Sequence, residues 1–164
     1  MIHAHTKSPA QTKDIGAALA KIAKPGDLLI LIGDLGAGKT TFAQGFAAGL
    51  GITKQVSSPT FTLASEYQGR LLLHHLDVFR LEHLSEVLDL DLFELLDGDN
   101  VTLIEWGNMI RQTLPTDYLE IAFTFTNSLE TSPDERTIIL QPTGNRWQNR
   151  ANTLSETLQP WITR

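Results

Sequence analysis

An unbroken apolar run followed at once by a glycine-rich loop constrains this chain more than any other feature. Leu28–Ile32 contains only leucine and isoleucine, which is typical of a strand buried on both faces of a parallel sheet. Gly33–Thr40 reads Gly-Asp-Leu-Gly-Ala-Gly-Lys-Thr and fits G-x-x-x-x-G-K-[ST], the phosphate-binding P-loop. Thr41–Leu50 carries apolar residues at helical spacing, and Gly51 follows where a helix commonly ends. This order aims a helix N-terminus at an anion, so we predict an α/β fold built around a phosphate site.

The residue types in the loop have chemical reasons. Glycines let the backbone N–H groups face a phosphate chain. Lys39 would bring a positive charge to the β- and γ-phosphates, and the Thr40 hydroxyl would hold Mg²⁺. We therefore predict that the residues contacting the nucleotide are Asp34, Leu35, Gly36, Ala37, Gly38, Lys39, Thr40 and Thr41.

Length, charge and cysteine content limit the number of domains, the compartment and the kinds of partner that this chain can have. A chain of 164 residues is most simply one domain, here a P-loop ATPase domain over residues 1–164. No run approaches the ~20 apolar residues of a membrane span, and the N-terminus does not resemble a signal peptide. The absence of cysteine excludes disulfides and thiolate metal sites and favours the cytoplasm. A net charge of −6 argues against a broad nucleic-acid surface, so a nucleic acid would be reached through a local patch or a partner.

Periodicity and turn residues predict a P-loop NTPase-like three-layer α/β sandwich, with a central, mainly parallel sheet and added antiparallel hairpins. We expect a helix over Thr12–Ala23, a hairpin of Phe61–Tyr67 and Leu71–Leu76, helix within Leu84–Leu96, a strand over Val101–Ile104, a second hairpin of Tyr118–Phe125 and Arg136–Leu140, and a closing helix over Asn145–Leu158. The first residues, including His3 and His5, are expected to be frayed, and no zinc site is predicted there.

Two acids follow apolar strands and could anchor the magnesium ion. A P-loop usually works with a carboxylate at the end of a neighbouring strand. Asp77 ends the run that begins at Leu71, and Glu105 ends Val101–Ile104. Because the carboxyl ends of parallel strands share one edge of a sheet, Glu105 would point towards the nucleotide. Each acid could instead be a solvated strand-end residue, so the pattern leaves open which one contacts the metal.

Three further features have two interpretations each. Pro59 stiffens the hydroxyl-rich loop Ser57–Thr62, which could sense a γ-phosphate or could be an ordinary turn before a strand. Trp106 could stack near the nucleotide or pack in the core. His74 and His75 are adjacent on a strand and therefore face opposite sides, which makes them a poor metal-binding pair; one could be a core or a site histidine, with the other exposed.

These segments, in this order and spacing, resemble the TsaE family, the bacterial P-loop ATPases of tRNA threonylcarbamoyladenosine biosynthesis. The resemblance runs from about Thr12 to Trp106. Beyond the P-loop it rests on Gly-Leu-Gly at 49–51, Ser-Pro-Thr-Phe-Thr-Leu at 58–63, His-Leu-Asp-Val-Phe-Arg-Leu at 75–81 and Ile-Glu-Trp at 104–106. The P-loop alone is moderately specific, whereas the combination is highly specific.

The resemblance implies a Mg²⁺-dependent ATPase that is weak alone and stimulated by partners of the TsaB and TsaD types. Those partners make N6-threonylcarbamoyladenosine at position 37 of tRNA, so tRNA would be reached only through the complex. By matching positions, Lys39, Asp77 and Glu105 would be catalytic, and Trp106 would lie near the ATP. Thr40, Thr60, Asp77 and Glu105 would surround the metal.

Other activities of P-loop proteins remain as alternatives. A small-molecule kinase would use the same loop but usually needs a lid of arginines over the phosphates, and the arginines here are few and scattered. A nucleotide-bound scaffold, in which hydrolysis is incidental, is a second alternative. A GTPase is less consistent with the sequence because the base-reading motif Asn-Lys-x-Asp is absent.

Overall fold

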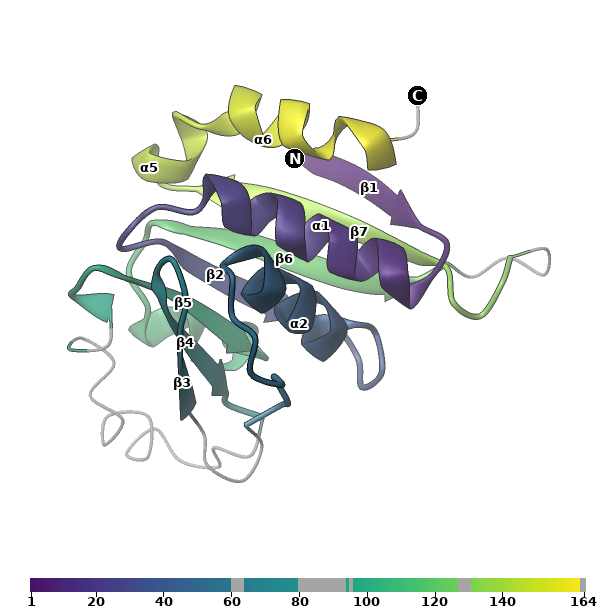
Figure 1. Ribbon diagram of the computed structural model, residues 1–164. Coiled ribbons are helices and arrows are strands. Elements are labelled where there is room, and N and C mark those ends of the chain that lie inside the picture. The colour runs from purple at the N-terminus through teal and green to yellow at the C-terminus, as the bar shows by residue number, and fades with distance from the viewer. Residues whose placement is uncertain (60–63, 80–93, 95, 127–130, 163–164) are drawn as a thin grey trace.

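One mixed sheet organises the computed structural model, which describes residues 1–59, 64–79, 94, 96–126 and 131–162 (Figure 1). Within those residues the sheet has seven strands in the order β1-β7-β6-β2-β5-β4-β3. The strands are β1 (Ile2–Thr6), β2 (Leu28–Ile32), β3 (Ala64–Gln68), β4 (Leu72–Asp77), β5 (Asn100–Glu105), β6 (Tyr118–Phe125) and β7 (Arg136–Thr143). β2 runs parallel to β5 and β6, and β4 runs parallel to β5. The outer pairs β1–β7, β6–β7 and β3–β4 are antiparallel, which confirms the predicted fold class.

Two helices lie side by side over one face of the central strands (Figure 1). They are α1 (Pro9–Ile22) and α2 (Lys39–Gly49), and α1 begins at Ser8, whose hydroxyl accepts a hydrogen bond from the Gln11 N–H. Their backbones touch, since a Cβ on Gly16 would collide with the Phe42 carbonyl oxygen. A Cβ on Gly45 would likewise collide with the Lys13 carbonyl oxygen. Only glycine therefore permits this separation of the two helices.

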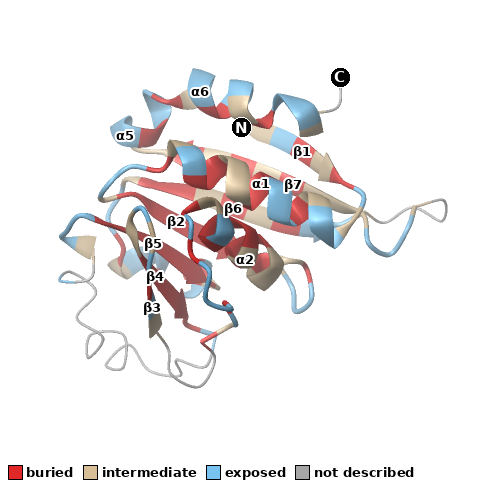
Figure 2. Cartoon of the chain, in the orientation of Figure 1, coloured by how far each residue is buried: buried red, intermediate tan, exposed pale blue. Residues whose placement is uncertain are grey.

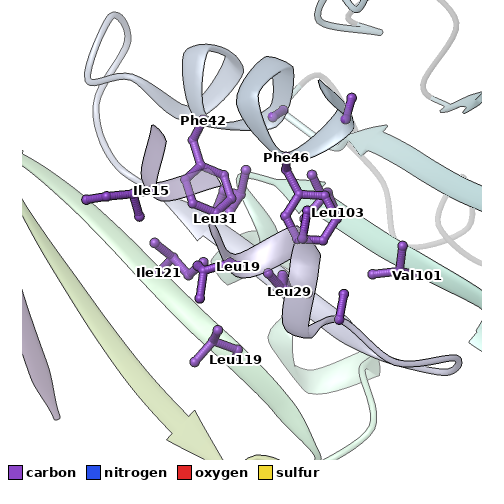
Figure 3. Packing of buried hydrophobic residues seen from close by; sticks show 14 of the residues in the cluster. Ile15, Leu19, Leu29, Leu31, Phe42, Phe46, Val101, Leu103, Leu119 and Ile121 are labelled. Atoms are coloured by element: carbon purple, nitrogen blue, oxygen red, sulfur yellow. The ribbon is translucent and has the colours of Figure 1, made fainter. Parts of the chain in front are cut away.

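The main core fills the space between these helices and the sheet (Figure 3). Leu29 and Leu31 of β2 alternate towards the helices, as a strand period of two requires. They meet Phe42 and Phe46 of α2, and the Phe42 ring lies edge-on to Phe123 with centroids 5.6 Å apart. The short helices α5 (Asn145–Gln148) and α6 (Ala151–Leu158) extend this core near α1.

The opposite face of the sheet has its own smaller core. Leu28 and Ile30 of β2 point there, together with Leu76 and Ile104. The 3₁₀ helix η1 (Gly107–Thr113) packs over β2 and contributes Ile110. A second 3₁₀ turn, η2 (Gln159–Trp161), follows α6. Figure 2 shows that the central strands are buried along their length, as expected for a sheet covered on both faces.

Most of the predicted strands and helices that fall within the described residues are present in the structure. The strand over Leu28–Ile32, the hairpin of β6 and β7 and the helix after the P-loop are confirmed. The pairing of β3 with β4 confirms the first hairpin, although residues 61–63 lie outside the described range. The helix predicted within residues 84–96 lies outside it except for positions 94 and 96. No helix in the described part of the chain has the length and apolar character that a bilayer crossing requires.

Two predictions about the ends of the chain are wrong. The first residues are not frayed but form β1, because Ala4 and Thr6 are buried and the strand pairs with β7. The Thr6 hydroxyl also hydrogen-bonds the Thr12 hydroxyl at 3.1 Å. The closing helix is interrupted, since Arg150 has φ −107° and ψ 13° and separates α5 from α6.

Candidate functional site

A cavity of about 380 Å³ opens at the carboxyl ends of the parallel strands, beside the N-terminus of α2. Gly38, the N-cap of α2, has φ 114°, a conformation that L side chains rarely adopt. The lining consists of Leu35, Gly36, Gly38, Lys39, Thr40, Thr41, Ser58, Asp77, Phe79, Glu105 and Trp106. Two of the residues predicted to contact nucleotide, Asp34 and Ala37, are not in the lining, and the Ala37 side chain is buried beneath the loop. Thr60 lies outside the described residues.

Lys39 lies at this cavity without an anionic hydrogen-bond partner among the described residues. Its Nζ donates to the carbonyl oxygens of Gly33 at 2.6 Å and Asp34 at 2.9 Å. It also lies 4.1 Å from the centroid of the Trp106 ring. Burial lowers the pKa of Lys39 below its ordinary value, while the negative charges of Glu105, Asp77 and Asp34 oppose this change. A further anion in the cavity would therefore stabilise the charged form of this lysine.

Asp77 and Glu105 come together opposite the loop. They end the neighbouring parallel strands β4 and β5 and are direct partners in the register. Both are almost fully buried, at 5% and 2% exposure. The Thr40 hydroxyl donates to Glu105 Oε1 at 2.9 Å, and the Ser58 hydroxyl donates to Asp77 Oδ2 at 2.7 Å. Within the described residues neither carboxylate forms an ion pair with lysine or arginine, so a cation in the cavity would be attracted to both.

This donor set fits a hard cation that is coordinated by protein oxygens and by a phosphate together. In the part of the chain that is described, no three His, Cys, Asp or Glu side chains are grouped to hold a metal ion by themselves. Mg²⁺ usually keeps several waters and binds one or two carboxylates together with substrate phosphates. Two carboxylates and two hydroxyls beside a phosphate loop match that requirement, whereas a self-contained zinc site would need more nitrogen or sulfur ligands.

Trp106 is held at the cavity by an unusual backbone. Its φ of 62° and ψ of 28° place a non-glycine residue in the left-handed region, where strain is commonly associated with function. Its backbone N–H donates to the Leu31 carbonyl at 2.8 Å, and its ring lies 4.6 Å from the Phe79 ring, centroid to centroid. The indole therefore both packs on the fold and lines the cavity.

Two further side chains support the site. Sequence reasoning missed Arg136 and left open which of His74 and His75 belongs to the site, and the expectation that the other histidine is exposed is wrong, because both are buried. Arg136 of β7 donates from Nε to the Ala37 carbonyl at 3.1 Å, and so holds the P-loop from a residue 99 positions away. His75 of β4 lies with Nε2 2.6 Å from Glu105 Oε2. The alternation of His74 and His75 is confirmed, because His74 instead approaches Glu66 of β3. The motif beginning at His75 was a signal for this residue, but nothing local signals Arg136.

Comparison with known proteins agrees with this geometry. The family model that matches residues 6–137 is described as TsaE, threonylcarbamoyl adenosine biosynthesis protein. The chain belongs to the TsaE family. It is 48% identical over 151 residues to the TsaE protein of Bacillus subtilis, covering 92% of this chain and 91% of that protein. The TsaE protein of Streptomyces coelicolor is 37% identical over 140 residues, covering 82% and 93%.

A solved structure has the same fold. The crystal structure titled Bacillus subtilus YdiB matches with a TM-score of 0.77 and 41% sequence identity, and the match covers 94% of each chain. Family and fold therefore agree along nearly the whole chain.

Proposed function

We propose that this protein binds ATP and Mg²⁺ in the cavity and hydrolyses ATP in support of tRNA N6-threonylcarbamoyladenosine formation. One observation carries the proposal. The lysine and threonine of a phosphate loop face two buried carboxylates, and in the described part of the chain neither carboxylate forms an ion pair with lysine or arginine. Membership of the TsaE family supplies the pathway. The chain acts as a single P-loop ATPase domain over residues 1–164, in the cytoplasm.

Each side chain has a defined role in this proposal. Lys39 leaves its carbonyl partners to bind the β- and γ-phosphates, and the backbone N–H groups of residues 34–41 face the phosphate chain. Thr40, Asp77 and Glu105 hold the metal and its waters, with Thr60 as a further hydroxyl, and bound Mg²⁺ neutralises charge on the phosphates. The Glu105 carboxylate also orients the attacking water. Trp106 contacts the nucleotide from the wall of the cavity.

The output of hydrolysis is a change in protein partners. Subunits of the TsaB and TsaD types perform the transfer, and this protein maintains their turnover and reaches tRNA only through them. Hydrolysis by the protein alone is slow for that reason.

The positions of the described arginines argue against a metabolite kinase. Arg70 donates to the Ala20 and Ala23 carbonyls, Arg111 pairs with Glu120, and Arg136 supports the P-loop. Arg146 and Arg150 pair with Asp27 at the far end of β2. None of these five lines the cavity, whereas a kinase lid requires arginines over the phosphates.

Steady-state ATP hydrolysis with and without the two partners tests the proposal. We expect slow turnover alone and strong stimulation by the partners. Fast turnover driven by a metabolite, with a phosphorylated product, would indicate a kinase instead. In a reconstituted modification assay, Glu105→Ala should fail over many turnovers, and full modification by this hydrolysis-deficient variant would indicate a scaffold.

Intrinsic fluorescence tests the position of Trp106. Nucleotide should change the emission of the wild-type chain. The change should disappear in Trp106→Phe, although Trp147 and Trp161 remain in that variant. An equal change in both proteins would place the nucleotide away from Trp106.

A further inference from the structure

His75 is buried against the carboxylate of Glu105 but is not part of the cavity lining. The histidine is fully buried in β4, and Glu105 is 2% exposed in β5. Imidazole Nε2 lies 2.6 Å from Glu105 Oε2. Because a carboxylate oxygen can only accept, Nε2 carries the hydrogen and donates it. Among the described residues, the hydrogen bond that links the histidine to the cavity lining is the one to Glu105.

The two oxygens of Glu105 are held by different partners. Oε1 accepts from the Thr40 hydroxyl at 2.9 Å, and Oε2 accepts from His75. The last torsion of a glutamate side chain is broad, so a carboxylate held at one oxygen can still turn. A second hydrogen bond from a buried strand residue removes that freedom. The carboxylate plane is therefore set before a ligand arrives.

The rest of the imidazole ring argues against a purely structural role. His75 Nδ1 is buried and has no hydrogen-bond partner in the described part of the chain. A buried polar atom without a partner costs free energy, and an apolar side chain of similar size would avoid that cost. The hydrogen bond to Glu105 is the interaction that an apolar residue could not replace.

We propose that His75 is a positioning residue that fixes the Glu105 carboxylate in the orientation that binds Mg²⁺. This inference rests on the proposed function, because it requires Glu105 in the metal shell. Outer partners that orient a metal ligand commonly contribute 10- to 100-fold to metal affinity. The expected signature is thus a loss of Mg²⁺ affinity with no loss of nucleotide affinity in the absence of metal.

The experiment is calorimetric titration of Mg²⁺ into the ADP-bound protein, with ADP titrated separately in the absence of metal. We expect His75→Leu to weaken Mg²⁺ binding by about 10- to 100-fold and to leave metal-free ADP binding unchanged. His75→Gln should recover most of the loss, because its terminal amide can donate from the position of Nε2. The matched control is His74→Leu. This change removes an equally placed buried histidine from the other face of the sheet and should not alter Mg²⁺ binding.

Three results would overturn the inference. His75→Leu could bind Mg²⁺ as the wild type does, it could lose metal-free ADP binding to the same extent, or His75→Gln could behave like His75→Leu. If His75→Leu does not fold, the shorter His75→Asn replaces it with the same expected loss. Failure of the proposed function is distinct, because Glu105→Gln would then leave Mg²⁺ affinity unchanged in a chain that retains His75.

Discussion

Both ends of strand β2 lie near buried carboxylates, but the carboxylates at the two ends have different hydrogen-bond and charge partners. Before the strand, the fully buried Asp27 side chain accepts from Arg150 at 2.6 and 3.0 Å, from Arg146 at 3.3 Å and from the Lys24 N–H at 2.8 Å. Beyond the strand, Asp77 and Glu105 are nearly as buried. Among the described residues they accept only from hydroxyls, a backbone N–H and His75.

The carboxylate before β2 contributes to stability, whereas the two carboxylates beyond it are available for function. A buried carboxylate with its own arginine is electrostatically complete, and Arg150 additionally donates to the Ile22 carbonyl and stacks on Trp147. This cluster joins the C-terminal helices to the turn that leads into β2. The pair of Asp77 and Glu105 has no such arginine among the described residues, which leaves it available to a cationic ligand. We therefore expect substitutions at the Asp27 end to change folding, and substitutions at the cavity to change binding and catalysis.

The largest effect is expected from Arg150→Met. This change keeps much of the side-chain volume but leaves Asp27 as a buried charge without its main partner, which should lower the free energy of unfolding by about 3–5 kcal/mol. Urea denaturation measures it. Asp77→Asn is the matched test at the cavity and should change stability by less than about 1 kcal/mol, since it removes like charge beside Glu105. Equal destabilisation by both variants would remove the contrast between the two ends.

Glu105→Gln comes next and should act on metal binding and on hydrolysis. Loss of the carboxylate should slow partner-stimulated ATP hydrolysis by about 100-fold, equivalent to about 2.7 kcal/mol. Metal-free ATP binding should be retained. Glu120→Gln is the control, because this acid lies in β6 and pairs with Arg111 away from the cavity. Hydrolysis at the wild-type rate in Glu105→Gln would show that the pair of Asp77 and Glu105 is not the catalytic one.

A smaller effect is expected in the pH dependence of the free energy of unfolding, through Lys39. Burial lowers its pKa in the folded chain below the ordinary value of 10.5, so the unfolded chain binds more protons between the two values. Stability should therefore rise with pH through that window, with a slope of at most about 1.4 kcal/mol per pH unit for one proton. Lys39→Met should lack this rise in unfolding experiments up to pH 10.5, whereas exposed Lys21→Met should retain it. A rise that persists in Lys39→Met would assign it to another group.

The smallest effect is expected at the exposed ion pair of Arg111 and Glu120, which tests how burial changes the contribution of an ion pair to stability. Arg111 and Glu120 are 2.6 Å apart, the same distance as Arg150 and Asp27, but 47% and 25% of their side chains are exposed. Arg111→Ala should cost no more than about 0.5 kcal/mol in urea denaturation, because solvent screens the pair. A cost near that of Arg150→Met would show that distance rather than burial determines the contribution.

What could be predicted from the sequence was local or carried by a motif. An apolar run, a loop of fixed spacing and helical periodicity predicted β2, the P-loop and α2, and the acids that end β4 and β5 could be placed by the geometry of parallel strands. The supporting contacts could not, since they join residues far apart in sequence. Arg136 reaches Ala37 across 99 positions, and Arg150 reaches Asp27 across 123.

The errors have the same physical origin. Ile2–Thr6 is as long as β2 but lacks its unbroken apolar run, and it becomes a strand because β7 provides the pairing partner near the other end of the chain. The interruption between α5 and α6 occurs where Arg150 forms its ion pair with Asp27. The periodicity of the sequence carries no information about this long-range contact. Neither error touches the cavity, because the P-loop and the strand-end acids are each encoded by consecutive residues.

The glycine contact between α1 and α2 fixes one wall of the cavity to the rest of the fold. Because Gly16 and Gly45 bring the two backbones together, α2 cannot tilt away from a bound phosphate without displacing α1. Through the hydrogen bond between Thr12 and Thr6, that displacement would extend to β1. The P-loop wall of the cavity is thus the rigid one. Any widening of the cavity would therefore come from the opposite wall, which includes Ser58 and Phe79.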